Sequence, residues 1–124
     1  MAEHNIIGQE GEKAAVDYLI SKGYKIHNTN WRKGRYELDI IAQTSDELVV
    51  VEVKTRSGNP MVAPEIAVDN KKIRNIISAT DLYINIYDID LPVRFDIISV
   101  TGYFPHFIIE HIEDAFYPPV NTYW

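Results

Sequence analysis

The sequence of 124 residues contains no cysteine, which excludes a disulfide scaffold, a thiolate zinc site and a cysteine nucleophile. Long apolar runs are missing too, because stretches such as Leu48–Val51 are far shorter than the roughly 20 residues of a transmembrane helix. The first residues lack the basic-then-apolar layout of a signal peptide, so we expect a cytoplasmic location and no membrane partner. Without repeats, low-complexity segments or linkers, the chain is expected to form one domain over 1–124, with a core at about 5–112 and a tail at 113–124.

Basic residues are scarce in the last third of the chain. Residues 86–124 carry one Lys/Arg and six Asp/Glu, a net charge of −5, whereas the whole chain has a net charge of −6. Nucleic-acid-binding proteins are usually basic, so the overall charge argues against a generic nucleic-acid binder. Residues 1–85 are nearly neutral and contain local basic clusters, which are the candidates for contact with phosphate.

Hydrophobic periodicity predicts the element order αβββαβ, followed by an edge strand. The first helix is expected over 6–22, ending at Gly23; its apolar stripe consists of Ala14, Ala15, Tyr18 and Leu19. Asp69 is the expected N-cap of a second helix, because apolar residues recur at helical spacing from Ile73. Strands are expected at 24–29, 36–43, 47–55, 93–100 and 107–112. This pattern predicts an α/β fold in which helices flank a mixed sheet.

Acidic residues concentrate on the two strands that a short polar loop joins into an antiparallel hairpin. Because side chains alternate along a strand, Glu37 and Asp39 should share one face, as should Glu52, Lys54 and Arg56 on the next strand. One register pairs Asp39 with Glu52 across a loop of about four residues; the other pairs Glu37 with Glu52 across about two. Both registers place Asp39, Glu52 and Lys54 in one patch, with Glu37 beside it.

A divalent cation is the simplest reason for clustered carboxylates, since like charges opposed across a sheet are destabilising. Carboxylate oxygens suit Mg²⁺ or Mn²⁺, which often bind through one or two carboxylates plus a substrate phosphate. Such a metal activates water and stabilises charge on a phosphoryl oxygen, while Lys54 would orient the water or stabilise the transition state. The patch therefore predicts metal-dependent phosphodiester hydrolysis with Asp39, Glu52, Lys54 and Glu37 as catalytic residues. A structural network of ion pairs is the alternative.

Several motifs together resemble the YraN family of uncharacterised bacterial proteins, over about residues 8–100. The motifs are Gly11-Glu12, Glu37-Leu38-Asp39-Ile40-Ile41-Ala42, Val51-Glu52-Val53-Lys54-Thr55-Arg56, Lys72 and Arg94-Phe95-Asp96. Asp39 followed by Glu52-Val53-Lys54 also resembles the PD-(D/E)xK nuclease superfamily. One departure is Tyr36, which stands where the family pattern usually has glycine.

The resemblance implies a restriction-endonuclease-like, or tRNA-endonuclease-like, core and a distant similarity to archaeal Holliday-junction resolvases. It implies that Glu12 joins Asp39 and Glu52 as a metal ligand, and that DNA is a better candidate substrate than RNA. Resolvase relatives work as pairs, so the resemblance also implies a homodimer, although the sequence shows no clear apolar interface for one.

The basic residues expected to contact nucleic acid are Arg32, Lys33, Arg35, Arg56 and Lys72. The first three form a basic turn beside Trp31, and solvated surface charge is the alternative interpretation. The four histidines lack metal-ligand spacing and are interpreted as incidental, while Arg94 and Asp96 are expected to pair structurally.

Two functions remain open. One is a metal-dependent endonuclease acting on DNA, with branched or structured DNA among its candidate substrates. The other is a non-catalytic nucleic-acid-binding or assembly module that keeps the nuclease fold, since a fold does not fix a function.

Overall fold

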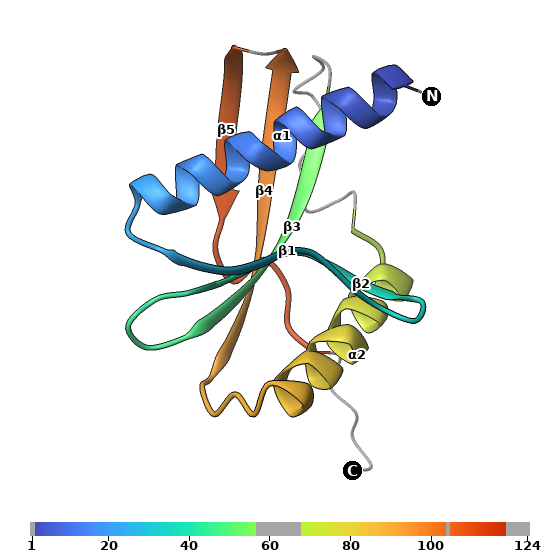
Figure 1. Cartoon of the computed structure of the whole chain (residues 1–124), viewed down its shortest axis with the longest axis vertical. Helices are drawn as coiled ribbons and strands as arrows, with labels where there is room; N and C mark the ends of the chain where they lie inside the picture. The colour runs from blue at the N-terminus through green and yellow to red at the C-terminus, as the bar shows by residue number, and fades with distance from the viewer. Residues whose placement is uncertain (1, 57–67, 104, 119–124) are drawn as a thin grey trace.

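A five-stranded mixed sheet forms the centre of the structure, a computed structural model that describes residues 2–56, 68–103 and 105–118 (Figure 1). The elements are α1 (Ala2–Ser21), β1 (Lys25–Lys33), β2 (Tyr36–Gln43), β3 (Leu48–Arg56), α2 (Asn70–Ile86), β4 (Val93–Tyr103) and β5 (His106–Ile112). The strand order is β1-β2-β3-β4-β5; β3 and β4 are parallel and every other neighbouring pair is antiparallel. The predicted α/β class, element order and edge position of the last strand are confirmed.

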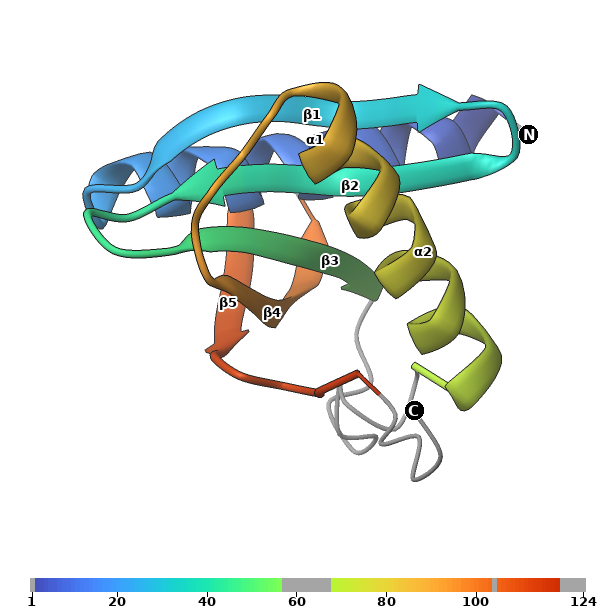
Figure 2. The same ribbon diagram turned by 90° about the horizontal axis from the view of Figure 1, so that it is seen from below.

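The two helices cover opposite faces of the sheet, as the two views of the ribbon show (Figures 1 and 2). Leu48 and Val50 of β3 pack in the cluster that contains the buried residues of α2, whereas Val49 and Val51 pack in the cluster that contains those of α1. Cover on both faces explains why this strand is a continuous apolar run rather than an alternating one. Neither helix, within the residues described, is long and apolar enough to cross a membrane.

The predicted signals at the ends of the helices are confirmed. Gly23, two residues after the end of α1, has φ +93, a conformation that glycine adopts without steric cost. The Asp69 side chain accepts a hydrogen bond from the backbone N–H of Lys72 at 2.8 Å and caps α2. On the apolar stripe of α1, Ala15 and Leu19 are fully buried.

The hairpin adopts the first of the two predicted registers, with pairs from Ile40↔Val51 to Gln43↔Leu48 and a four-residue connection at 44–47. The first strand, by contrast, is longer than predicted. β1 extends to Lys33, so Arg32 and Lys33 belong to a strand and only Gly34 and Arg35 form the turn.

Strict alternation along β2 fails at Asp39. Leu38 packs in the cluster on the α2 face, but Ile40 packs in the cluster on the α1 face. In the β1–β2 ladder, the residues on either side of Asn30 and Asp39 are paired, but Asn30 and Asp39 themselves are not. Asn30 has φ +50, a left-handed conformation that the sequence pattern did not predict. Because the alternation of side chains shifts at Asp39, its side chain does not follow the regular pattern of the strand.

Candidate functional site

Asp39 and Glu52 meet where β2 leaves β3. The ladder between these strands ends at Ile40↔Val51, and beyond it Asp39 Oδ2 accepts a hydrogen bond from the backbone N–H of Val53 at 2.9 Å. When Glu52 is protonated, its carboxyl group can share a hydrogen bond with the Asp39 carboxylate. The predicted proximity of these two carboxyl groups is therefore present, and the Val53 N–H fixes the orientation of one of them.

Burial perturbs Glu52 strongly, since only 7% of this residue is exposed. Desolvation, followed by the charge of Asp39, raises the pKa of Glu52 from 4.5 to about 7. The charges of Lys72 and Lys54 oppose this rise without cancelling it. Near neutral pH the Glu52 carboxyl group is thus poised between its protonated and ionised forms.

Two lysines converge on the same carboxylate oxygen. Lys54 Nζ lies 3.6 Å from Glu52 Oε2, and Lys72 Nζ lies 3.5 Å from it. Lys54 comes from β3 itself, as predicted, whereas Lys72 comes from the first turn of α2. Lys72 was predicted to contact nucleic acid, and the structure places its ammonium group within the carboxylate site.

Glu12 approaches Asp39 from α1. Burial, together with the charges of Asp39 and Glu37, raises the pKa of Glu12, while a hydrogen bond with the Asn30 side chain lowers it. Asn30, which sequence reasoning missed, therefore positions the Glu12 side chain. The helix comes this close because Gly11 lies against the Thr55 side chain, where a Cβ would collide.

Glu37 is directed elsewhere, into an exposed ion pair with Arg32 at 3.1 Å. Across the residues that the structure describes, no group of three or more His, Asp or Glu side chains is arranged to hold a metal ion. The site is thus a pair of carboxyl groups, Asp39 and Glu52, with Glu12 near Asp39 and two ammonium groups on Glu52.

The basic residues at the β1–β2 turn are accessible. Arg32, Lys33 and Arg35 are exposed, and the Arg35 guanidinium lies 5.6 Å from the centroid of the Tyr36 ring. Trp31 is not part of this surface: it is 7% exposed, and its indole N–H donates to the Tyr87 hydroxyl at 3.3 Å. Trp31 adjoins the basic residues in sequence, as predicted, but its side chain packs in the core.

Comparison with known proteins agrees with these motifs. The model of the Uncharacterised protein family UPF0102 matches residues 11–100. The chain belongs to the UPF0102 family, which confirms the YraN resemblance. A UPF0102 protein of Phocaeicola vulgatus is 56% identical over 120 residues, covering 97% of this chain and 99% of the relative. A UPF0102 protein of Bacteroides fragilis is 55% identical with the same coverage. One from Flavobacterium psychrophilum is 48% identical over 117 residues, covering 94% and 98%.

A second polar network of this UPF0102 chain surrounds Asp96, which is fully buried. Arg94 donates to both oxygens of Asp96 at 2.9 and 2.8 Å, which confirms their predicted pairing. His111 Nε2 lies 2.7 Å from Asp96, and the Tyr18 hydroxyl lies 3.2 Å from His111 Nδ1. Arg94 also donates to the Tyr24 hydroxyl at 2.6 Å. The interpretation of His111 as incidental is therefore wrong, because its ring links β5 to β4 and α1.

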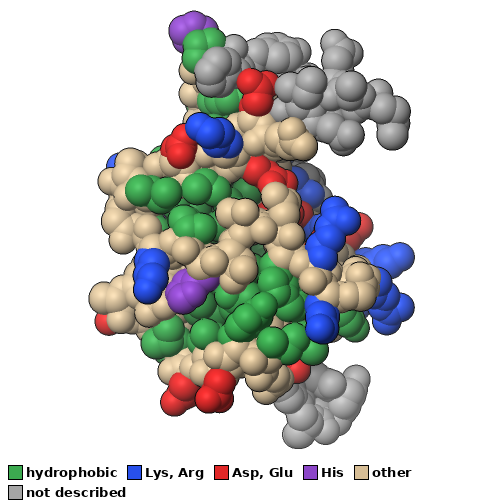
Figure 3. All heavy atoms as spheres, in the orientation of Figure 1, with side chains coloured by type: hydrophobic (Ala, Val, Ile, Leu, Met, Phe, Trp, Pro, Cys, Tyr) green, Lys and Arg blue, Asp and Glu red, His purple; other side chains and the backbone are tan. Residues whose placement is uncertain are grey.

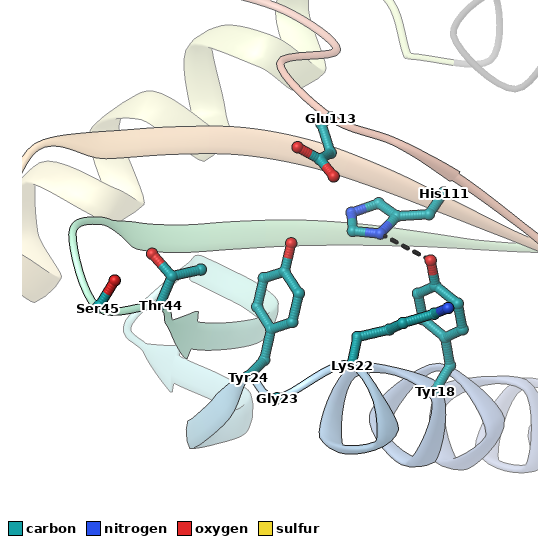
Figure 4. A pocket seen from close by; sticks show the side chains of 8 residues that line it. All are labelled: Tyr18, Lys22, Gly23, Tyr24, Thr44, Ser45, His111 and Glu113. Atoms are coloured by element: carbon teal, nitrogen blue, oxygen red, sulfur yellow. Dashed lines mark hydrogen bonds between the residues drawn. The ribbon is translucent and has the colours of Figure 1, made fainter.

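This network borders a pocket of about 660 Å³ between the end of α1, the β2–β3 turn and the end of β5 (Figure 4). Burial alone would raise the pKa of Asp96, but hydrogen bonds from His111 and Arg94 outweigh it and lower that pKa. Asp96 is thus stabilised in its ionised form. Because its interactions tie α1, the segment before β1, β4 and β5 together, we assign the network a structural role.

Proposed function

We propose that this UPF0102 chain is a metal-dependent nuclease with a restriction-endonuclease-like core of the PD-(D/E)xK type, which hydrolyses phosphodiester bonds in DNA. The observation that carries the proposal is the meeting of Asp39 and Glu52 at the point where β2 leaves β3, with Lys54 against Glu52. The order αβββαβ of the elements supports it as well.

The donor set fits Mg²⁺ or Mn²⁺. Mg²⁺ takes oxygen ligands and is usually held by one or two carboxylates, with waters and substrate phosphate completing its shell, so a third protein carboxylate is not required. Asp39 and Glu52 would hold the ion. Glu12, which lies near Asp39, would be the third metal ligand. When bound, the metal would supply an acidified water and charge for the phosphoryl oxygens.

The residues of the chain prepare this chemistry. The hydrogen bond from Val53 N–H holds Asp39 in place before substrate arrives, and Asn30 does the same for Glu12. The Lys54 ammonium group, which lies against Glu52, would stabilise the negative charge that develops on the scissile phosphate. Lys72 adds a second positive charge.

The exposed arginines and lysine at the end of β1 and in the β1–β2 turn would bind the nucleic-acid backbone. Arg32, Lys33 and Arg35 provide sequence-independent phosphate contacts, and guanidinium groups present a fork to phosphate oxygens. Arg56, half-buried at the end of β3, lies two residues beyond Lys54 and would extend this surface.

Cleavage assays test the proposal directly. Labelled duplex, single-stranded and branched DNA, and matched RNA, are incubated with protein in Mg²⁺ or Mn²⁺. Asp39→Asn, Glu52→Gln and Lys54→Met should each lower the rate by at least about 10²-fold, as expected for removing one stabilising group. Asp81→Asn, at an exposed position on α2, is the matched control and should cleave normally. Cleavage that survives Asp39→Asn and Glu52→Gln, or is absent from the wild type, would refute the assignment.

Metal binding provides a readout independent of turnover. Titration calorimetry with Mn²⁺ should show heat for the wild type and for Asp81→Asn, and an affinity at least about 10-fold weaker for Asp39→Asn, since carboxylates dominate such sites. Equal binding by all three proteins would place the metal elsewhere.

The second candidate is a nucleic-acid-binding module without catalysis. It is favoured by the two lysines that already accompany Glu52. It predicts binding without turnover, with an affinity that falls as salt rises. Replacing Arg32 and Lys33 with alanine should reduce the slope of log affinity against log salt by about 0.7–0.9 for each phosphate group that the variant no longer neutralises. Binding that is insensitive to salt would contradict this candidate.

A further inference from the structure

The two edges of the sheet are built differently. β1 carries Lys25, Arg32 and Lys33, and its ladder contains a register shift between Ile26 and Asn28. Positive charges and bulges are devices that discourage a sheet edge from pairing with another chain. β5 (His106–Ile112) has none of these: it contains no lysine, arginine, proline or glycine, and its register with β4 is continuous from one end to the other.

β5 also exposes an apolar residue at its centre. Ile108 is 72% exposed, and it shares the face opposite α1 with the exposed residues His106 and Glu110. A regular, apolar, unprotected edge strand is a template for strand addition. Sequence and exposure thus indicate a pairing surface along β5.

The sequence of β5 complements itself. When two copies run antiparallel with Ile108 opposite Ile108, Glu110 of each copy lies opposite His106 of the other. A carboxylate then faces an imidazole at both ends of the strand pair, and the two exposed isoleucines cover each other. Cross-strand pairs of opposite or hydrogen-bonding character stabilise such ladders by about 0.2–1 kcal/mol each.

The face of β5 that is turned toward α1 has room for side chains of the added strand. A cavity of about 650 Å³ lies between α1 and β5 and is lined by Ala14, Tyr18, Phe107 and Ile109, among others. Tyr18 also lines the pocket of Figure 4, so hollows follow β5 along much of its length. Figure 3 shows hydrophobic side chains gathered on the face that α1 crosses.

The first helix extends beyond the sheet at this edge. In both ribbon views the end of α1 projects past the outer side of β5 (Figures 1 and 2). A strand added at about 4.8 Å from β5 would therefore lie beside the helix. Because side chains alternate, Phe107 and Ile109 of the second copy would face the same side as α1.

We propose that two copies of this chain associate through antiparallel pairing of their β5 strands, centred on Ile108, into one continuous ten-stranded sheet. The inference does not depend on nuclease activity. It rests on the contrast between the two edges, the self-complementary strand and the cavity beside it.

Disulfide trapping tests the register, because the chain has no cysteine of its own. Directly opposed residues have Cα atoms about 4.5–5.5 Å apart, which lies within the range of a disulfide. The Ile108→Cys variant should therefore form a covalent dimer under mild oxidation. In the Glu110→Cys variant the two sulfurs would be separated by about four residues, roughly 13 Å, and should not cross-link. Equal cross-linking at both positions, or none at position 108, would overturn the proposed register.

Mass in solution tests the association itself. Light scattering at about 100 μM should give twice the 14.3 kDa of the chain for the wild type. Ile108→Lys should give the single-chain mass, whereas Ile86→Lys, at an exposed isoleucine on α2, should leave the dimer intact. Circular dichroism checks that both variants fold. A monomeric wild type, or a dimeric Ile108→Lys, would refute the proposal.

Discussion

Replacing Glu52 with glutamine should stabilise the metal-free protein at pH 8 while removing its proposed catalytic function. Glu52 is buried beside Asp39, and desolvation followed by the charge of Asp39 raises its pKa to about 7. Ionisation therefore weakens the folded state. A glutamine side chain has nearly the same shape, carries no charge and can donate a hydrogen bond to Asp39, as the protonated acid does.

The size and sign of the effect follow from the pKa values. The unfolded chain releases the Glu52 proton near pH 4.5, whereas the folded chain retains it until about pH 7. Below pH 4.5 the wild type and the variant should be similarly stable. As pH rises from 4.5 to 7 the wild type loses stability, and above pH 7 the loss is complete. A rise from 4.5 to about 7 corresponds to about 3 kcal/mol, a large fraction of a typical folding free energy.

Urea denaturation in EDTA at several pH values between 4.5 and 8 measures this difference. The stability advantage of Glu52→Gln should grow through that window and then level off, while Asp81→Asn, at an exposed position on α2, should match the wild type throughout. An advantage that does not change with pH, or a Glu52→Gln variant that is less stable at pH 8, would refute the reasoning. Added Mn²⁺ should narrow the gap by stabilising only the wild type.

Other substitutions test the supporting structure. Arg94→Met should cost about 3–5 kcal/mol in urea denaturation, because Asp96 would be left buried without its main partner; a loss below 1 kcal/mol would contradict that assignment. Gly11→Ala should cost about 1–3 kcal/mol through overpacking, and combining it with Thr55→Ala should recover most of the loss; no recovery would mean that the collision lies elsewhere. Asn30→Ala should lose about 1–2 kcal/mol more than Asn30→Gly, because only glycine adopts φ +50 freely; equal losses would assign the effect to the side chain.

Sequence reasoning predicted the hairpin well because local chemistry determines it. The polar connection after Gln43 permits only a short turn, and the register that brings Asp39 toward Glu52 is one of two that such a turn allows. The capping of α2 by Asp69 was predictable for the same reason, since the signal lies within one turn of helix.

Other features depended on tertiary contacts that no local pattern contains. Strict alternation along β2 would put Leu38 and Ile40 on one face of the sheet. They lie on opposite faces, because the alternation shifts at Asp39, opposite the left-handed backbone of Asn30. His111 shows no metal-ligand spacing, and its partner Asp96 lies on a neighbouring strand, so its role becomes visible only when β4 and β5 are paired.

The two buried carboxylates among the residues that the structure describes, Asp96 and Glu52, show why the Asp39–Glu52 pair is the stronger candidate site. Hydrogen bonds from His111 and Arg94 lower the pKa of Asp96 against the effect of burial, so its ionised form is stabilised. Glu52 has two lysines within 3.6 Å, yet burial and its neighbour Asp39 keep its pKa near 7. If the sheet only had to be stable, replacing Glu52 with a neutral residue would increase the stability of the folded state. A carboxyl group retained at such a cost in stability, beside a second carboxylate and within reach of ammonium groups, is typical of sites where charge is used in function.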